Sequence, residues 1–164
     1  MLVANVVNGP DNALNEDWKS TIARATGSGK RVIGYVRTGY LGVSQQRFTT
    51  RLGSNDLADW VAQIQTDVET WYNLYGNAIG GIFFDEGWND CGPNNVYAEL
   101  YRYINHWTKT RHPDAYTVLN PGATMPQVSC LIYLPSSRSR LEDDTKDIDA
   151  AASCQPQRGS HIIH

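Results

Sequence analysis

The sequence predicts an α/β fold, an incomplete (β/α)8 barrel of the TIM type with about four strand–helix units and an irregular C-terminal tail. Two observations support this fold class. Short runs of β-branched and aromatic residues alternate with longer amphipathic segments, which is typical of a parallel sheet covered by helices. Each run also ends in polar residues, glycine and proline, so the most elaborate loops follow the carboxyl ends of the strands, as on the functional rim of a barrel.

The first half of the chain supplies two strands and a helix. Residues 1–7 are rich in β-branched side chains and predict a strand, which the turn-forming residues 8–12 end. Apolar residues spaced by three or four between 14 and 25 predict a helix, which two glycines end. Residues 31–36 predict the second strand, and a loop with two glycines follows it.

The second half repeats the alternation. The predicted order is helix, strand, helix, strand, over residues 57–75, 79–84, 96 to before Pro113, and 116–120. Asn55 or Asp56 is expected to cap the first of these helices, whose apolar stripe has a clear 3.6-residue period. Asn94 or Asn95 is expected to cap the second.

A doubly wound sheet is the alternative architecture. Such a sheet usually has a glycine-rich phosphate loop between its first strand and the next helix, and no such loop follows residues 1–7. The segment 27–30, Gly-Ser-Gly-Lys, looks like a fragment of a phosphate loop, but it precedes a strand instead of opening a helix. We therefore interpret it as a plain connection.

The composition excludes several classes of protein. A net charge of −3 and the lack of a basic stripe give no reason to propose nucleic acid as a partner. No apolar stretch approaches the ~20 residues of a membrane span, and no signal peptide opens the chain. The three cysteines form no Cys-x-x-Cys or Cys/His cluster, so the sequence predicts no metal site. It does not indicate an oligomeric state.

The chain changes character near residue 127. We predict a partial barrel domain over 1–127 and a low-order tail over 128–164, which is rich in serine, arginine and aspartate. The change is abrupt, and a retained intron or a non-native reading frame would explain it. Transcript sequencing across codon 127 tests this hypothesis, and a continuous read into the tail would count against it.

The run that ends in Asp85 and Glu86 is the most informative feature for function. Residues 80–84 are apolar, and a buried strand tolerates charge poorly unless the charge has a partner or a role. Neighbouring residues of a strand point to opposite faces, so we expect the two carboxylates to diverge. At the carboxyl end of a barrel strand they indicate acid/base chemistry, although capping of a loop or helix is the alternative interpretation.

Several short motifs resemble one family. They are Ala-Asn-Val-Val-Asn-Gly-Pro at 4–10, Val-Ile-Gly-Tyr-Val-Arg-Thr-Gly-Tyr at 32–40, Trp-Tyr at 71–72, Gly-Ile-Phe-Phe-Asp-Glu at 81–86 and Val-Leu-Asn-Pro-Gly at 118–122. In this order and spacing they resemble the spherulin-4 family, which includes glycoside hydrolases that cleave α-1,4-linked galactosamine and N-acetylgalactosamine polymers. The resemblance implies a (β/α)8 barrel, a polysaccharide substrate, no cofactor, and a secreted or cell-surface location.

By this resemblance Asp85 and Glu86 form the acidic catalytic core. Glycoside hydrolysis requires two carboxyl groups roughly 5 Å apart for retention, or about 6.5–9.5 Å for inversion. The family's further acid normally follows the Asn-Pro-Gly strand, and no strand end in 128–164 matches it. The family also has a strand before residues 1–7, so we expect a chain truncated at both ends.

The predicted substrate-binding residues follow the strands as well. They are Asn8, Tyr35, Thr38, Trp88 and Asn120. The polar members are suited to hydrogen bonding with sugar hydroxyl or acetamido groups, and Trp88 is suited to stacking on a sugar ring. For each residue, turn formation or core packing is the alternative. For the whole chain, the alternative function is a non-catalytic cell-surface glycan-binding or developmental protein.

Overall fold

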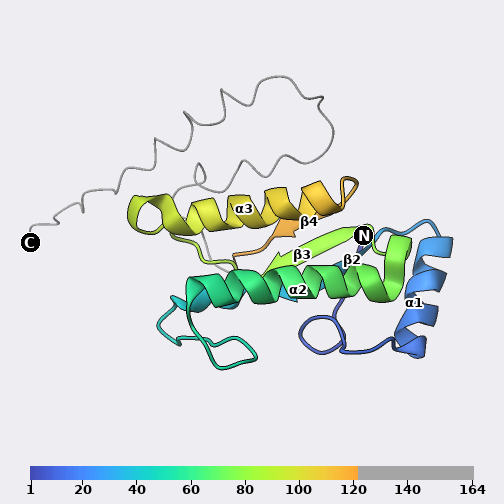
Figure 1. Ribbon diagram of the computed structural model, residues 1–164. Helices are drawn as coiled ribbons and strands as arrows, with labels where there is room; N and C mark the ends of the chain where they lie inside the picture. The colour runs from blue at the N-terminus through green and yellow to red at the C-terminus, as the bar shows by residue number, and fades with distance from the viewer. Residues whose placement is uncertain (122–164) are drawn as a thin grey trace, which may run out of the picture.

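The computed structural model of the protein describes residues 1–121 (Figure 1). Four strands form one sheet of order β1-β2-β3-β4, and every neighbouring pair is parallel. The strands are β1 (Leu2–Ala4), β2 (Val32–Arg37), β3 (Gly81–Asp85) and β4 (Tyr116–Leu119). The α/β class predicted from the alternating pattern is therefore confirmed.

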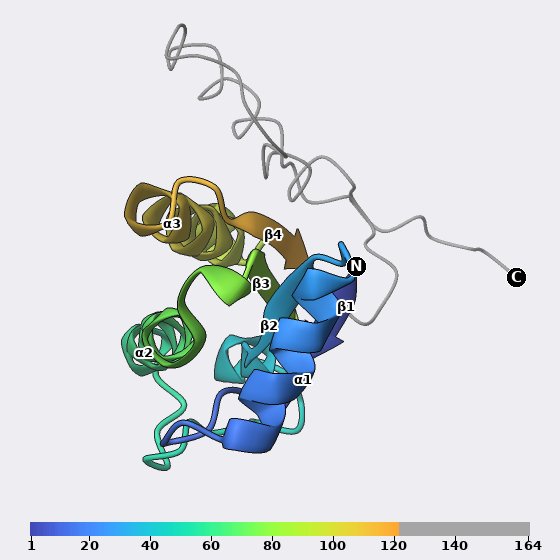
Figure 2. The same ribbon diagram turned by 90° about the vertical axis from the view of Figure 1, so that its right-hand side faces the viewer.

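Three helices connect the strands in turn. They are α1 (Glu16–Gly27), α2 (Leu57–Tyr75) and α3 (Val96–Arg111), with short 3₁₀ turns η1 (Gly39–Gly42), η2 (Gly76–Ala78) and η3 (Pro93–Asn95) in the connections. The helices lie along one face of the sheet (Figure 2). The N-cap residues of α2 and α3 are Asp56 and Asn95, so in each predicted pair the second residue is the cap.

The first strand is shorter than predicted. The sequence suggested a strand over 1–7, whereas β1 ends at Ala4. The Asn5 side chain accepts a hydrogen bond from the Gly9 backbone N–H at 3.1 Å, and Val6 N–H donates to the Gly9 carbonyl. This local turn competes with continuation of the strand, although the residues are β-branched. The predicted tail at 128–164, and with it the boundary at 127, lies outside the described residues.

The core lies between the sheet and the helices. Trp60 and Trp71 of α2 are fully buried there. A Cβ atom on Gly34 would lie 2.6 Å from the Trp71 ring, so only glycine lets α2 lie this close to β2. Trp71 Nε1 then donates to the Tyr35 carbonyl at 2.7 Å. Because Gly34 faces α2, Tyr35 lies on the sheet face that is turned away from the helices.

Candidate functional site

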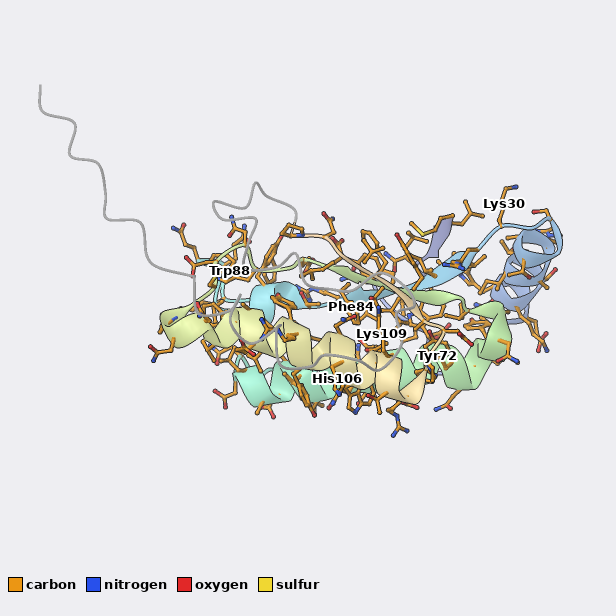
Figure 3. All side chains as sticks on the ribbon, turned by 90° about the horizontal axis from the view of Figure 1, so that it is seen from above. Lys30, Tyr72, Phe84, Trp88, His106 and Lys109 are labelled. Carbon is orange, nitrogen blue, oxygen red and sulfur yellow. The ribbon has the colours of Figure 1, made fainter. Side chains whose placement is uncertain are left out.

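The polar strand ends meet at the carboxyl end of the sheet. Figure 3 shows Trp88 at this end of the molecule and Lys30 at the opposite end. The register pairs Arg37 of β2 with Asp85 of β3, and the Asn120 backbone N–H donates to the Phe84 carbonyl at 2.8 Å. Residues from three different strand ends therefore lie side by side.

Asp85 is held by two neutral donors. Tyr35 OH donates to Asp85 Oδ2 at 2.8 Å, and Asn120 Nδ2 donates to Oδ1 at 2.7 Å. Asp85 is half-buried. Burial, together with the hydrogen bond to Asp85, raises the pKa of Tyr35 well above its ordinary value, so the phenol keeps its proton and remains a donor. Three of the predicted site residues thus form one connected cluster.

Glu86 points to a different partner. Its backbone adopts a left-handed conformation with φ of 57°, and its Oε2 accepts from Arg37 Nε at 2.6 Å. Both side chains are about one-fifth exposed, at 23% for Arg37 and 21% for Glu86. The Arg37 guanidinium also lies over the Phe48 ring, 4.7 Å from its centroid. The two adjacent carboxylates therefore have different partners. Glu86 lies beyond the end of β3, so the alternation expected within a strand does not apply to it.

Thr38 holds the backbone of Asp85 and Glu86 through its side-chain hydroxyl. Its hydroxyl lies 2.9 Å from the Asp85 carbonyl, 2.8 Å from the Glu86 carbonyl and 3.3 Å from Tyr101 OH. The Thr38 side chain is fully buried, so its hydroxyl faces the protein instead of the solvent from which a sugar would approach. The core-packing alternative describes this residue better than the predicted sugar contact does.

Tyr101 of α3 extends the same network. Its OH accepts from the Trp88 backbone N–H at 2.8 Å and contacts Thr38. Burial raises the pKa of Tyr101 to about 12, so the hydroxyl stays neutral. Hydrogen bonds therefore connect the Trp88 backbone to the carbonyls beside the carboxylates through one buried tyrosine and one buried threonine.

Trp88 belongs to a row of aromatic side chains. Its ring meets Tyr40 edge-on, with centroids 6.2 Å apart and an interplanar angle of 81°. Tyr40 in turn stacks on Phe48 at 5.7 Å. Trp88 and Tyr40 are half-buried. This row borders Arg37 and Glu86, and its partly exposed rings are suited to contact with an apolar sugar face.

Asn8 lies apart from the Asp85 cluster. It is exposed on the β1–α1 loop, with a left-handed φ of 61°. Within residues 1–121 no hydrogen bond joins it to Asp85 or Glu86. It lines instead a cavity of about 160 Å³ that also borders Arg37. Asn8 is therefore connected to the acidic pair only through Arg37, which lines the same cavity and binds Glu86.

A left-handed turn supports Glu86 from the β2 side. All four residues of η1 have positive φ: 56° at Gly39, 50° at Tyr40, 55° at Leu41 and 70° at Gly42. The Tyr40 backbone N–H donates to the Glu86 carbonyl at 2.7 Å. Left-handed backbone is costly for residues with a Cβ atom, so the surrounding contacts must hold this turn in place.

Comparison with known proteins identifies the family. A model of spherulation-specific family 4, the spherulin-4 family, matches residues 1–164. The chain belongs to this family. A search of curated proteins and a search of solved structures each returned no match.

Sequence reasoning missed two residues of this spherulin-4 site. Arg37 was read only as part of a motif, although a cation at the end of a strand next to Asp85 is a usable signal. Tyr101 falls within the helix predicted to begin at residue 96, and nothing in its spacing distinguishes a core tyrosine from one whose hydroxyl contacts Thr38. Both depend on pairings between segments that are distant in sequence.

The described part of this spherulin-4 chain shows no arrangement for a metal ion and no helix that could span a membrane. Within residues 1–121, no group of three or more His, Cys, Asp or Glu side chains is arranged to hold a metal ion. The same residues contain no helix that is both long and apolar enough to cross a membrane.

Proposed function

We propose that this chain is a glycoside hydrolase-like domain that acts on galactosamine- or N-acetylgalactosamine-containing polysaccharide through carboxylate acid/base chemistry. The observation on which this rests is the position of Asp85. It is half-buried at the carboxyl end of a parallel sheet, and its two oxygens accept hydrogen bonds from Tyr35 and Asn120. Its partners are neutral donors, which orient a carboxylate without consuming its charge.

In this proposal the four-stranded sheet is part of a (β/α)8 barrel. The all-parallel order and the helices on a single face support it. Tyr35 and its register partner Phe83 lie on the face turned away from the helices, with ring centroids 6.2 Å apart. In a barrel that face lines the interior, and the ends of its strands supply the catalytic groups.

Asp85 is the proposed reacting carboxylate, either as acid/base or as nucleophile. Glu86 has the proposed role of orienting Arg37, since its Oε2 is engaged by Arg37 Nε at 2.6 Å. Hydrolysis also requires a second carboxyl group across the scissile bond. The family resemblance assigns that group to a strand after β4, beyond the described residues.

The test is the release of reducing ends from an α-1,4-galactosamine polymer, in free and N-acetylated forms. Asp85→Asn keeps the size of the side chain and is expected to lower the rate at least 100-fold, because an amide cannot accept or donate the proton. Asp114→Asn is the matched control, since Asp114 is exposed in the α3–β4 connection. Equal activity of Asp85→Asn and the native chain would overturn the assignment.

The second candidate is a non-catalytic cell-surface glycan-binding or developmental protein, and the aromatic row of Tyr40, Phe48 and Trp88 favours glycan binding. Retention on the immobilised polymer without release of reducing ends identifies this function. In that case Trp88→Ala is expected to weaken retention several-fold. Neither the native chain nor Asp85→Asn would then release reducing ends.

A further inference from the structure

A polar cavity lies beside Arg37. Its volume is about 160 Å³. It is lined by Val7, Asn8, Arg37, Thr49, Thr50, Arg51 and Gln63. These residues come from the β1–α1 loop, the end of β2, the loop before α2 and α2 itself. The lining therefore contains two guanidinium groups and no carboxylate.

Arg37 is fixed in place but retains free donors. Its Nε donates to Glu86, and its guanidinium lies over the rings of Phe48, at 4.7 Å, and Trp60, at 5.8 Å. Within residues 1–121 its two terminal nitrogens have no hydrogen-bond partner. A planar, pre-oriented guanidinium with free N–H groups matches the geometry of an oxyanion with two or more oxygens.

Arg51 is paired with a carboxylate that is not part of the cavity lining. Both of its terminal nitrogens donate to Asp67 of α2, whose side chain is only 1% exposed. Burial raises the pKa of Asp67, against the opposing effect of Arg51. Asp67 orients the guanidinium without lining the cavity, and within residues 1–121 Arg51 Nε has no hydrogen-bond partner.

Gln63 and Thr49 add neutral donors. Gln63 Oε1 accepts from the Arg51 backbone N–H at 2.7 Å, and this bond leaves the amide –NH₂ of Gln63 available. Thr49 is exposed, and its hydroxyl has no hydrogen-bond partner within the described part of the chain. The lining therefore offers neutral hydrogen-bond donors beside its two guanidinium groups.

We infer that this cavity binds an oxyanionic substituent of a glycan, either the carboxylate of a uronic acid or a sulfate ester. Arg37 connects the cavity to Glu86, so the substituent would lie next to the sugar at the carboxylates. The identification of the ligand as a glycan rests on the proposed function, but binding of an oxyanion at the cavity does not require catalysis.

The experiment measures binding of monosaccharide probes to the full chain by NMR at low ionic strength. Galacturonate and galactose 6-sulfate represent the two oxyanions, and galactose is the neutral control. At least one acidic probe is expected to bind tenfold or more tightly than galactose. Preference for one probe identifies the source of the oxyanion. Equal affinity for galactose and both acidic probes would overturn the inference.

Gln63→Glu places a negative charge in the cavity and keeps the acceptor for the Arg51 N–H. It is expected to weaken binding of the acidic probes at least tenfold. Gln65→Glu makes the same charge change outside the cavity, where Gln65 contacts Tyr103, and is expected to leave binding unchanged. Equal effects of the two substitutions would contradict the inference.

Asn8→Asp also introduces a negative charge into the cavity, from an exposed loop, and serves as the second variant if Gln63→Glu fails to fold. It is expected to weaken binding of the acidic probes in the same way. Asp85→Asn keeps the cavity intact and is expected to bind the acidic probes as the native chain does. If Asp85→Asn keeps the native rate of polymer cleavage while the acidic probes still bind preferentially, the proposed function fails and this inference stands. If cleavage is lost but galactose and the acidic probes bind the native chain equally, this inference fails and the proposed function stands.

Discussion

The two ends of the sheet differ in how they form positive-φ turns. Within residues 1–121, every non-glycine residue with positive φ lies in a connection that leaves the carboxyl end of a strand; they are Asn8, Tyr40, Leu41, Arg47, Glu86, Asn94 and Asn95. At the amino end, positive φ before β2 and β3 belongs to glycines such as Gly29 and Gly76. One end therefore stores backbone strain and the other avoids it.

This difference indicates that backbone strain lowers stability at the carboxyl end of the sheet. A left-handed residue with a Cβ atom costs about 1–2 kcal/mol relative to ordinary backbone, and such residues persist only where packing holds them. The strained end is also the end at which Asp85 and Glu86 lie. Strain at this end supports the interpretation of the carboxyl rim as the functional one, and the following predictions test the comparison.

The largest expected effect is at Gly39. A Cβ atom there would lie 2.0 Å from Cη2 of the buried Trp60, and φ is +56°. We expect Gly39→Ala to lower the free energy of unfolding by about 3 kcal/mol or more, because strain and overpacking add. Urea denaturation measures this change.

Gly29→Ala is the matched control at the amino end. Its φ is also positive, at +77°, but a Cβ atom there would meet nothing within 4 Å. Only the backbone cost of about 1 kcal/mol is expected. Equal losses at Gly39 and Gly29 would show that packing at the carboxyl end does not enforce the turn.

An intermediate effect is expected at alkaline pH. Burial raises the pKa of Tyr101 to about 12, whereas an unfolded tyrosine titrates near 10. The stabilisation from this group is complete below pH 10 and is lost as the pH rises toward 12, by about 1.4 kcal/mol near pH 11. Urea denaturation between pH 8 and pH 11.5 measures the loss, and Tyr101→Phe is expected to reduce it.

Tyr72, in the last turn of α2, is a control that distinguishes the effect of a raised pKa from the effect of a hydrogen bond. Burial also raises its pKa to about 12, but its OH has no hydrogen-bond partner among the described residues. At neutral pH, Tyr101→Phe is expected to cost about 1–2 kcal/mol, because the Trp88 N–H loses its acceptor, while Tyr72→Phe is close to neutral. Equal costs at neutral pH would contradict a structural role for the Tyr101 hydroxyl.

The smallest expected effect is at Arg47. This residue is exposed and left-handed, with φ of 46°. Arg47→Gly relieves the Cβ strain, and the greater freedom of glycine in the unfolded chain offsets part of the gain. A net stabilisation of about 0.5 kcal/mol is expected by thermal or urea denaturation. A clear destabilisation would mean that the Arg47 side chain has a role of its own.

The order of the elements was predictable because hydrophobic periodicity and turn residues are local signals. The apolar stripe of α2 and the glycine after it set both ends of that helix within one or two residues. The end of β1 was not predictable in the same way, because the Asn5 side chain competes for the Gly9 N–H. The β-strand propensity of the β-branched residues predicts a longer strand, because propensity does not include the hydrogen bond from Gly9 to the Asn5 side chain.

The candidate site was predictable only as a set of strand ends. Asp85, Tyr35 and Asn120 were named from their positions, and the structure brings them within hydrogen-bond distance. The pairing of Arg37 with Glu86 depends on strand register and on the left-handed φ of Glu86, and neither can be read from residue types. Asn8 was grouped with the others because it follows a strand, yet it lines the cavity beside Arg37 and has no hydrogen bond to Asp85 within residues 1–121.

The left-handed turn at Gly39–Gly42 also has a kinetic consequence. An isolated turn of this hand is unfavourable, so it becomes stable only after Trp60 has packed against it. We therefore expect its contacts to form after the folding transition state, once the core around Trp60 is assembled. Substitutions in this turn should accelerate unfolding while leaving the refolding rate nearly unchanged. The lifetime of the native carboxyl rim is thus set by a few residues that contribute little to how fast the chain folds.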